Sequence, residues 1–182
     1  MRLSVYRFED GVETQDVNAV VYDLERDAAE LGGAPVSGPA IVWRFDGDEA
    51  AADGALLTHV VALDPSTDWI VRCDRIDFPL GGIAHRHVHP GPGIRYLLRG
   101  EIEIETEEHT TVYGPGEPWF ERGPDPVRAR ASARVETSFV RTLVLPAEWS
   151  GRRTITYLEP VDDTAPRQSA NVFLEHELTL PL

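Results

Sequence analysis

The sequence predicts an all-β protein, an antiparallel sandwich or barrel of short strands. Three observations support this fold class. Short apolar segments fill the chain after residue 54, and glycine and proline turns separate them at intervals of about ten residues. Within the segments, apolar and polar residues often alternate, as in 101–106, which is the pattern of a strand with one buried face. The length of 182 residues suits one domain with a sizeable core.

The N-terminal part has a different pattern. A short strand is expected within 1–15, followed by an amphipathic helix over 16–31, where valines and leucines recur every three or four residues and Gly32-Gly33 ends the run. A strand over 40–45 and an acidic loop over 46–54 follow. We therefore predict two parts, an N-terminal extension (1–54) that packs on the barrel and the barrel domain itself (55–182).

The barrel strands are expected in the segments between the turns. In chain order they are 56–63, 68–76, 83–89, 94–99, 101–106, 110–113, 119–120, 127–133, 137–145, 154–158 and 171–180.

Composition excludes several classes of function. The net charge is −14, and all 17 cationic side chains are arginine. Such an acidic surface repels phosphate and anionic lipid, so neither nucleic acid nor a membrane is expected as a partner. The lack of lysine excludes Schiff-base chemistry. Cys73, the only cysteine, is expected to be a buried structural thiol. No apolar run is long enough for a membrane span or a signal peptide, which predicts a cytoplasmic protein.

The candidate site lies in 81–100. His85, His87 and His89 occupy alternate positions, so in an extended strand all three imidazoles would project from one face. Neutral imidazole is the commonest protein ligand for transition metals, and three clustered imidazoles are hard to satisfy as core filling. The pattern therefore predicts a pocket that binds a metal or a small molecule.

This stretch resembles the first motif of the cupin superfamily. Gly81, His87, His89 and Gly100 stand at the motif's anchor positions, and Gly93 stands where metal-binding cupins carry a glutamate ligand. The resemblance implies a single double-stranded β-helix, or jelly-roll, barrel. The second motif is degenerate. Counting from Gly116 places Val127 at its histidine ligand, and counting from Gly114 places Asp125 there.

Several residues are candidates for the chemistry. His87 and His89 are the expected metal ligands, for Fe, Mn, Ni or Zn. His85 is expected to be a third ligand, a supporting residue or an acid–base group. Arg95 should face the interior, where it either clamps a substrate carboxylate or forms a salt bridge to Glu103 or another acid. Further candidates are Glu121 or Asp125, either of which would complete a two-histidine, one-carboxylate set, and His59 as a reserve ligand.

The function that the resemblance implies is binding of a small organic molecule in the barrel, with a metal-dependent dioxygenase as the leading hypothesis. Two alternatives stay open. One is a metal-independent isomerase, epimerase or cyclase in which the histidines act as acid–base groups, and the other is a non-catalytic ligand-binding protein. The substrate is expected to be a small molecule, and a carboxylate on it would suit a clamp by Arg95. A homodimer is expected, since cupins commonly cover their exposed strand edges in this way.

Overall fold

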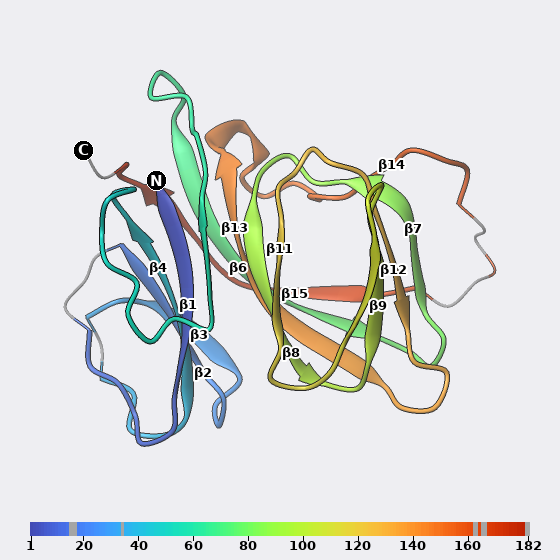
Figure 1. Ribbon diagram of the computed structural model, residues 1–182, viewed down its shortest axis with the longest axis horizontal. Helices are drawn as coiled ribbons and strands as arrows, with labels where there is room; N and C mark the ends of the chain where they lie inside the picture. Colours follow the sequence, from blue (N-terminus) through green and yellow to red (C-terminus); the bar gives the residue numbers. More distant parts are fainter. Residues whose placement is uncertain (15–17, 34, 162–163, 165–166, 181–182) are drawn as a thin grey trace.

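The computed structural model describes residues 1–14, 18–33, 35–161, 164 and 167–180, and nearly all of its regular structure is β-strand. The strands form three five-stranded antiparallel sheets, one of which stands beside a barrel made of the other two (Figure 1). The all-β prediction is confirmed. Within the described residues the only helix is a 3-10 turn, η1 (Ala147–Trp149), and none there is long and apolar enough to cross a membrane.

The N-terminal sheet has the strand order β3-β2-β4-β1-β5. Its strands are β1 (Arg2–Phe8), β2 (Ala19–Asp23), β3 (Ala28–Leu31), β4 (Ala40–Asp46) and β5 (Leu57–Val60). Because β5 pairs with β1, this sheet continues past residue 54. The division into an extension and a barrel domain at that residue stays a prediction.

The predicted helix over 16–31 is wrong. Residues 16–17 lie outside the described residues, and the rest forms the β2–β3 hairpin. Both faces of β2 are buried, since Val20 and Val21 belong to different core clusters on opposite sides of the sheet. A strand buried on both faces has a continuous apolar run, whose spacing also fits a helix. Asp23 then reverses the chain, because its Oδ1 accepts hydrogen bonds of 2.9 Å from two backbone N–H groups of the turn.

The barrel consists of two facing sheets with the strand orders β11-β8-β13-β6-β15 and β10-β9-β12-β7-β14. The strands are β6 (Trp69–Phe78), β7 (Ile83–Val88), β8 (Gly93–Arg99), β9 (Ile102–Glu105), β10 (Thr110–Tyr113), β11 (Pro118–Glu121), β12 (Val127–Ala131), β13 (Thr137–Pro146), β14 (Thr156–Tyr157) and β15 (Ser169–Leu178). Strands β6 to β13 alone have the order of an eight-stranded jelly roll. No ladder joins the two sheets within the described part of the chain, so the barrel is open.

The N-terminal sheet covers the outer face of the barrel sheet that contains β8. Along β8, Ile94 and Tyr96 belong to the core shared with the N-terminal sheet, whereas Leu97 belongs to the core inside the barrel. The indole Nε1 of Trp43 on β4 donates a 3.1 Å hydrogen bond to the carbonyl oxygen of Ile94. Cys73 is fully buried in this interface, as predicted, and burial raises the pKa of its thiol. Since alternate residues point to opposite faces, this packing directs Arg95 into the barrel.

Candidate functional site

A β-bulge in β7 determines which histidines face the barrel interior. β7 pairs with β12 through His87 opposite Val127 and Ala84 opposite Ala129, so three residue steps on β7 match two on β12. The extra residue changes the side-chain alternation between Ala84 and His87. His85 consequently lies with its Nδ1 3.6 Å from Oε1 of Glu159. It does not line the cavity between the two barrel sheets, which His87 and His89 do line. The prediction that three imidazoles share one face is therefore wrong for His85, because the strand is not regular there.

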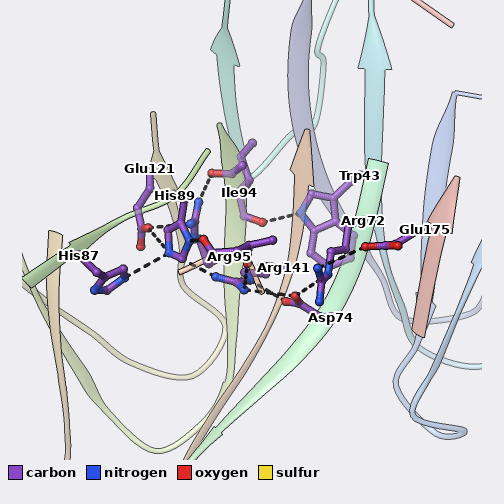
Figure 2. A network of polar contacts seen from close by, with 12 residues as sticks. Trp43, Arg72, Asp74, His87, His89, Ile94, Arg95, Glu121, Arg141 and Glu175 are labelled. Atoms are coloured by element: carbon purple, nitrogen blue, oxygen red, sulfur yellow. Dashed lines mark hydrogen bonds and ion pairs between the residues drawn. The ribbon is translucent and has the colours of Figure 1, made fainter. Parts of the chain in front are cut away.

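His87 and His89 form a buried pair at the end of β7 (Figure 2). Their Nε2 atoms lie 3.2 Å apart, and each ring makes a second contact through Nδ1. Nδ1 of His87 lies 2.7 Å from the carbonyl oxygen of His85, and Nδ1 of His89 lies 2.7 Å from that of Thr154. A carbonyl oxygen only accepts, so both Nδ1 atoms carry the proton, and both Nε2 atoms present a lone pair to the same point.

Glu121 brings a carboxylate to this pair from β11, in the facing sheet. On β11 it is the cross-strand partner of Gly93, the position at which the motif lacks its glutamate. Its Oε2 lies 3.6 Å from Nε2 of His89, while Oε1 accepts a hydrogen bond of 2.9 Å from the indole of Trp119. Position 93 itself has no room for a side chain, because a Cβ there would lie 2.3 Å from the carbonyl oxygen of Thr142.

Arg95 forms a buried salt bridge with Glu121. It is completely buried, its Nη2 lies 2.6 Å from Oε2 of Glu121, and its Nη1 donates a 2.7 Å hydrogen bond to the carbonyl oxygen of Gly93. Burial lowers the pKa of Arg95 to about 10. Of the two expected roles, the geometry agrees with the salt bridge, with Glu121 in place of the expected Glu103. Arg95 is not among the residues that line the main cavity.

A second arginine, on β13, stands on the other side of His89. Nη1 of Arg141 lies 3.4 Å from Nε2 of His89, and its Nε and Nη2 donate to the carboxylate of Asp74 over 2.6 and 3.2 Å. Asp74 also faces Arg72, whose Nε lies 3.3 Å from Oδ2. All three charged groups are buried, so they hold one another and the adjacent imidazole in place.

These groups line one end of a cavity of about 370 Å³ between the two barrel sheets. The opposite end is apolar and lined by Ile76, Phe78, Ala84, Ile104, Trp119, Ala129 and Phe139. Segment 151–155 and β15 form the remaining wall. A cavity with an apolar body and a compact polar end is typical of a site for a small organic molecule.

Two expected ligands lie elsewhere. Asp125 is exposed and pairs with Arg122 at 3.8 Å, and His59, on β5 of the N-terminal sheet, stacks on Phe120 with ring centroids 4.0 Å apart. Val127, at the second motif's histidine position, stands opposite His87 and is buried in the barrel core.

Comparisons with known proteins found similar structures but no matching family model. No protein-family model matches the chain, and no curated protein matches it. Among solved structures, the polyketide cyclase RemF from Streptomyces resistomycificus is 18% identical over 55% of this chain and 67% of its own, with a TM-score of 0.41. A cupin superfamily protein from Desulfitobacterium hafniense is 13% identical over 47% of this chain and 84% of its own, with a TM-score of 0.38. A cupin 2 conserved barrel domain protein from Leptotrichia buccalis is 12% identical over 79% of this chain and 73% of its own, with a TM-score of 0.40.

The strand order and the motif glycines agree with the architecture that the sequence motif implies. Strands β6 to β13 follow the jelly-roll order, with the His-x-His pair at the end of β7. Gly81 and Gly100, the outer anchors of the motif, have φ angles of 67° and 85°, a backbone conformation that favours glycine. The barrel is a jelly roll, the architecture that the resemblance to the first cupin motif implies. The N-terminal sheet adds a third layer to the two sheets of this barrel.

Residues of the site that sequence reasoning missed are Asp74, Arg141 and Thr154. A signal was present for Arg141, the one charged residue in the apolar strand β13, whereas Asp74 lies among other charged residues in β6. Burial of a charge costs several kcal/mol unless it is paired, so a lone arginine in a buried strand indicates an acidic partner. Thr154 precedes β14 and has no such signal, because it contributes its backbone carbonyl to His89.

Burial also sets the protonation of the two histidines. It lowers the pKa of His87, and it holds the pKa of His89 well below the ordinary value, where the guanidinium groups of Arg141 and Arg95 lower it further. Both imidazoles are therefore neutral at pH 7 and available as bases or as ligands.

The neutral state of His89 predicts a pH dependence of stability in EDTA-treated protein. The unfolded chain takes up a proton near pH 6.5 and the folded one does not, so stability is present above that pH and falls as the pH decreases. From about pH 7.5 to about 5.5, we expect the wild type to lose about 1 kcal/mol more unfolding free energy in urea than His89→Gln. His109→Gln, at an exposed hairpin tip, should lose as much as the wild type. Equal losses in the wild type and His89→Gln would mean that His89 protonates freely in the fold.

Proposed function

We propose that this protein is a metal-dependent enzyme that acts on a small organic molecule in the cavity of the cupin barrel, with dioxygenase-type chemistry. His87, His89 and Glu121 are the proposed ligands, and Fe, Mn, Ni or Zn the proposed metal. Two histidines and one carboxylate with open positions are the ligand set of non-haem iron oxygenases.

One observation supports this proposal above the others, the contact between the two Nε2 atoms. Both Nδ1 protons are committed to backbone carbonyls, so two lone pairs face each other over 3.2 Å and a cation between them would relieve their repulsion. With metal–nitrogen distances of about 2.0–2.1 Å, that separation corresponds to a ligand–metal–ligand angle of roughly 100°, which tetrahedral and octahedral sites accept.

The carboxylate of Glu121 and the charges around the histidine pair also suit a bound metal ion. Oε2 of Glu121 is buried, forms an ion pair with Nη2 of Arg95 at 2.6 Å and lies 3.6 Å from Nε2 of His89, so a carboxylate oxygen stands next to the histidine pair. Asp74 and Glu121 offset the charge of Arg141 and Arg95 nearby. Within the described residues, no three histidine, cysteine, aspartate or glutamate side chains already have the arrangement of a metal centre. The proposal is accordingly a two-histidine site that Glu121 completes.

The chain's own residues have separable tasks in this proposal. The carbonyl oxygens of His85 and Thr154 fix the tautomer and the orientation of the two rings, a support that metal-ligating histidines usually have. Arg95 holds Glu121 against the pair, and the apolar end of the cavity excludes water from the body of the substrate. A metal bound there would act as a Lewis acid with open coordination positions.

The test is metal titration of EDTA-treated protein with Fe(II), Mn(II), Ni(II) and Zn(II), followed by calorimetry and elemental analysis. Wild-type protein is expected to bind about one equivalent of at least one of these ions, and His87→Ala to lose at least about tenfold in affinity. His109→Ala removes an exposed histidine and should bind like the wild type. Absence of binding above background in the wild type would overturn the proposal, as would wild-type affinity in His87→Ala. If the ion is bound, oxygen uptake by the Fe(II)-loaded protein with candidate aromatic substrates tests the dioxygenase assignment.

A second candidate is a metal-independent isomerase, epimerase or cyclase. The same Nε2–Nε2 contact favours it, because two neutral imidazoles present their lone pairs at one point as general bases, and a proton taken from the substrate would be shared between them. Activity that survives EDTA treatment and is lost in His89→Gln would favour this candidate. Ligand binding without turnover in either state would favour a non-catalytic cupin. The homodimer, the cytoplasmic location and the catalytic role of His85 stay predictions.

A further inference from the structure

The side chains that line the cavity carry a net positive charge, whereas the protein as a whole is negatively charged. The chain carries a net charge of −14, yet the described residues that line the cavity include four arginines, Arg72, Arg141, Arg152 and Arg153, and two carboxylates, Asp74 and Glu121. We propose that the cavity selects an anionic organic molecule, with an apolar, aromatic body at the inner end and its anionic group under Arg152 and Arg153. The inference rests on the proposed function only in taking a small molecule as the occupant of the cavity.

The interior charges are balanced. Asp74 faces Arg72 and Arg141, Glu175 lies 3.2 Å from Nη1 of Arg72, and Glu121 pairs with Arg95. The surplus of positive charge therefore comes from Arg152 and Arg153, which are exposed and form no ion pair with any described residue; Arg153 lies over the ring of Tyr157, 5.7 Å from its centroid, and keeps its charge. A surplus of one sign at the entrance of a low-dielectric cavity focuses the field and attracts ligands of the opposite sign.

The two arginines lie beside the polar end of the cavity. They directly precede Thr154, whose carbonyl oxygen accepts from Nδ1 of His89 and whose hydroxyl lies 3.3 Å from Nη2 of Arg141. Arg72 anchors the same segment, because its Nη1 donates a 2.6 Å hydrogen bond to the carbonyl oxygen of Arg152. An anionic group in this position would have cations above it and the histidine pair beside it.

Arg141 supplies the inner donor for that group. Its Nε and Nη2 are committed to Asp74, and Nη1, which is directed at His89, has no carboxylate partner within the described residues (Figure 2). Nη1 is thus the guanidinium nitrogen available to an oxygen bound next to the histidine pair. Charge-assisted hydrogen bonds of this kind are about twice as strong as neutral ones.

The apolar end of the cavity defines the rest of the ligand. Phe78, Trp119 and Phe139 line it, and the rings of Trp119 and Phe139 pack edge to face with centroids 5.0 Å apart. No charged side chain lies among the described residues at that end. Such a surface suits a flat hydrocarbon or aromatic ring system, which gains free energy from burial and has no polar groups to leave unpaired.

The test compares two probes of nearly the same shape, anionic 2-naphthoate and neutral 2-naphthamide, by calorimetry on EDTA-treated protein at low salt. The wild type is expected to bind the naphthoate about tenfold more tightly or better, and added salt should reduce this preference. In Arg152→Gln/Arg153→Gln, both positions are exposed, so folding should be unaffected, and we expect the preference to fall at least about threefold with unchanged naphthamide affinity. Arg122→Gln/Arg134→Gln changes the net charge equally, outside the cavity, and should keep the preference.

Equal affinity of the wild type for the two probes, no binding of either, or an unchanged preference in Arg152→Gln/Arg153→Gln would overturn the inference. Repetition with metal-loaded protein separates it from the proposed function. A preference for the naphthoate that appears only after metal loading would assign the anion to the metal, which overturns the arginine site and supports the metal. A preference in EDTA-treated protein that never binds metal would support the arginine site and overturn the metal.

Discussion

Replacement of Asp74 by asparagine is expected to lower the free energy of unfolding by about 3–5 kcal/mol, the usual cost of removing one partner from a buried ion pair. Asp74 is completely buried, and its carboxylate accepts from Arg141 and faces Arg72. The amide has nearly the same shape, so the loss would come from charge and not from packing. Two guanidinium groups would remain in the barrel with less countercharge. Urea denaturation at neutral pH measures the difference.

The matched control lies on the same strand. Asp77→Asn removes a carboxylate that is partly exposed and lies 2.9 Å from Nε of Arg75. Exposed ion pairs contribute about 0–1 kcal/mol, so the two variants of β6 should differ several-fold in their effect. Equal effects would show that the Asp74 network is solvated and adds little to stability. That result would also remove the structural basis for a rigid Arg141 beside the histidine pair.

The sequence predicted those parts of the fold that depend on local pattern. Turns with obligatory backbone geometry, such as Gly81 and Gly100, and strands with one buried face were recognisable one by one. The β2–β3 hairpin was missed because its first strand is buried on two sides. That environment exists only once the N-terminal sheet packs on the barrel, and no local window of sequence contains it.

In the candidate site, too, local spacing predicted some residues, and only long-range strand pairing places the others. The pair formed by His87 and His89 follows from their spacing, since alternate residues share a face. His85 has the same spacing but lies outside the cavity, because the bulge in β7 depends on pairing with β12, which comes some forty residues later in the chain. Similarly, Glu121 meets His89 only through the pairing of β11 with β8. Long-range strand register was therefore the missing information in both cases.

Gly93→Ala tests why the carboxylate comes from Glu121. The added Cβ would lie 2.3 Å from the carbonyl oxygen of Thr142 and 2.7 Å from a methyl group of Leu143, so β8 and β13 would have to move apart. The backbone oxygen cannot swing aside as a side chain can, and we expect a loss of about 2–4 kcal/mol, measured by urea or thermal unfolding.

Gly114→Ala is the matched control, because its Cβ would meet only the end of the Glu117 side chain, at 3.5 Å, and stability should change by less than about 1 kcal/mol. If Gly93→Ala were as stable as the wild type, β8 and β13 would be able to separate there. Position 93 would then have room for the glutamate that the motif lacks, and the close approach of the strands would not explain its absence. A large loss would mean that the close packing of β8 on β13 leaves no room for a side chain at position 93. Glu121, directly across the ladder, is then the carboxylate that the same pair of strands still allows beside His89.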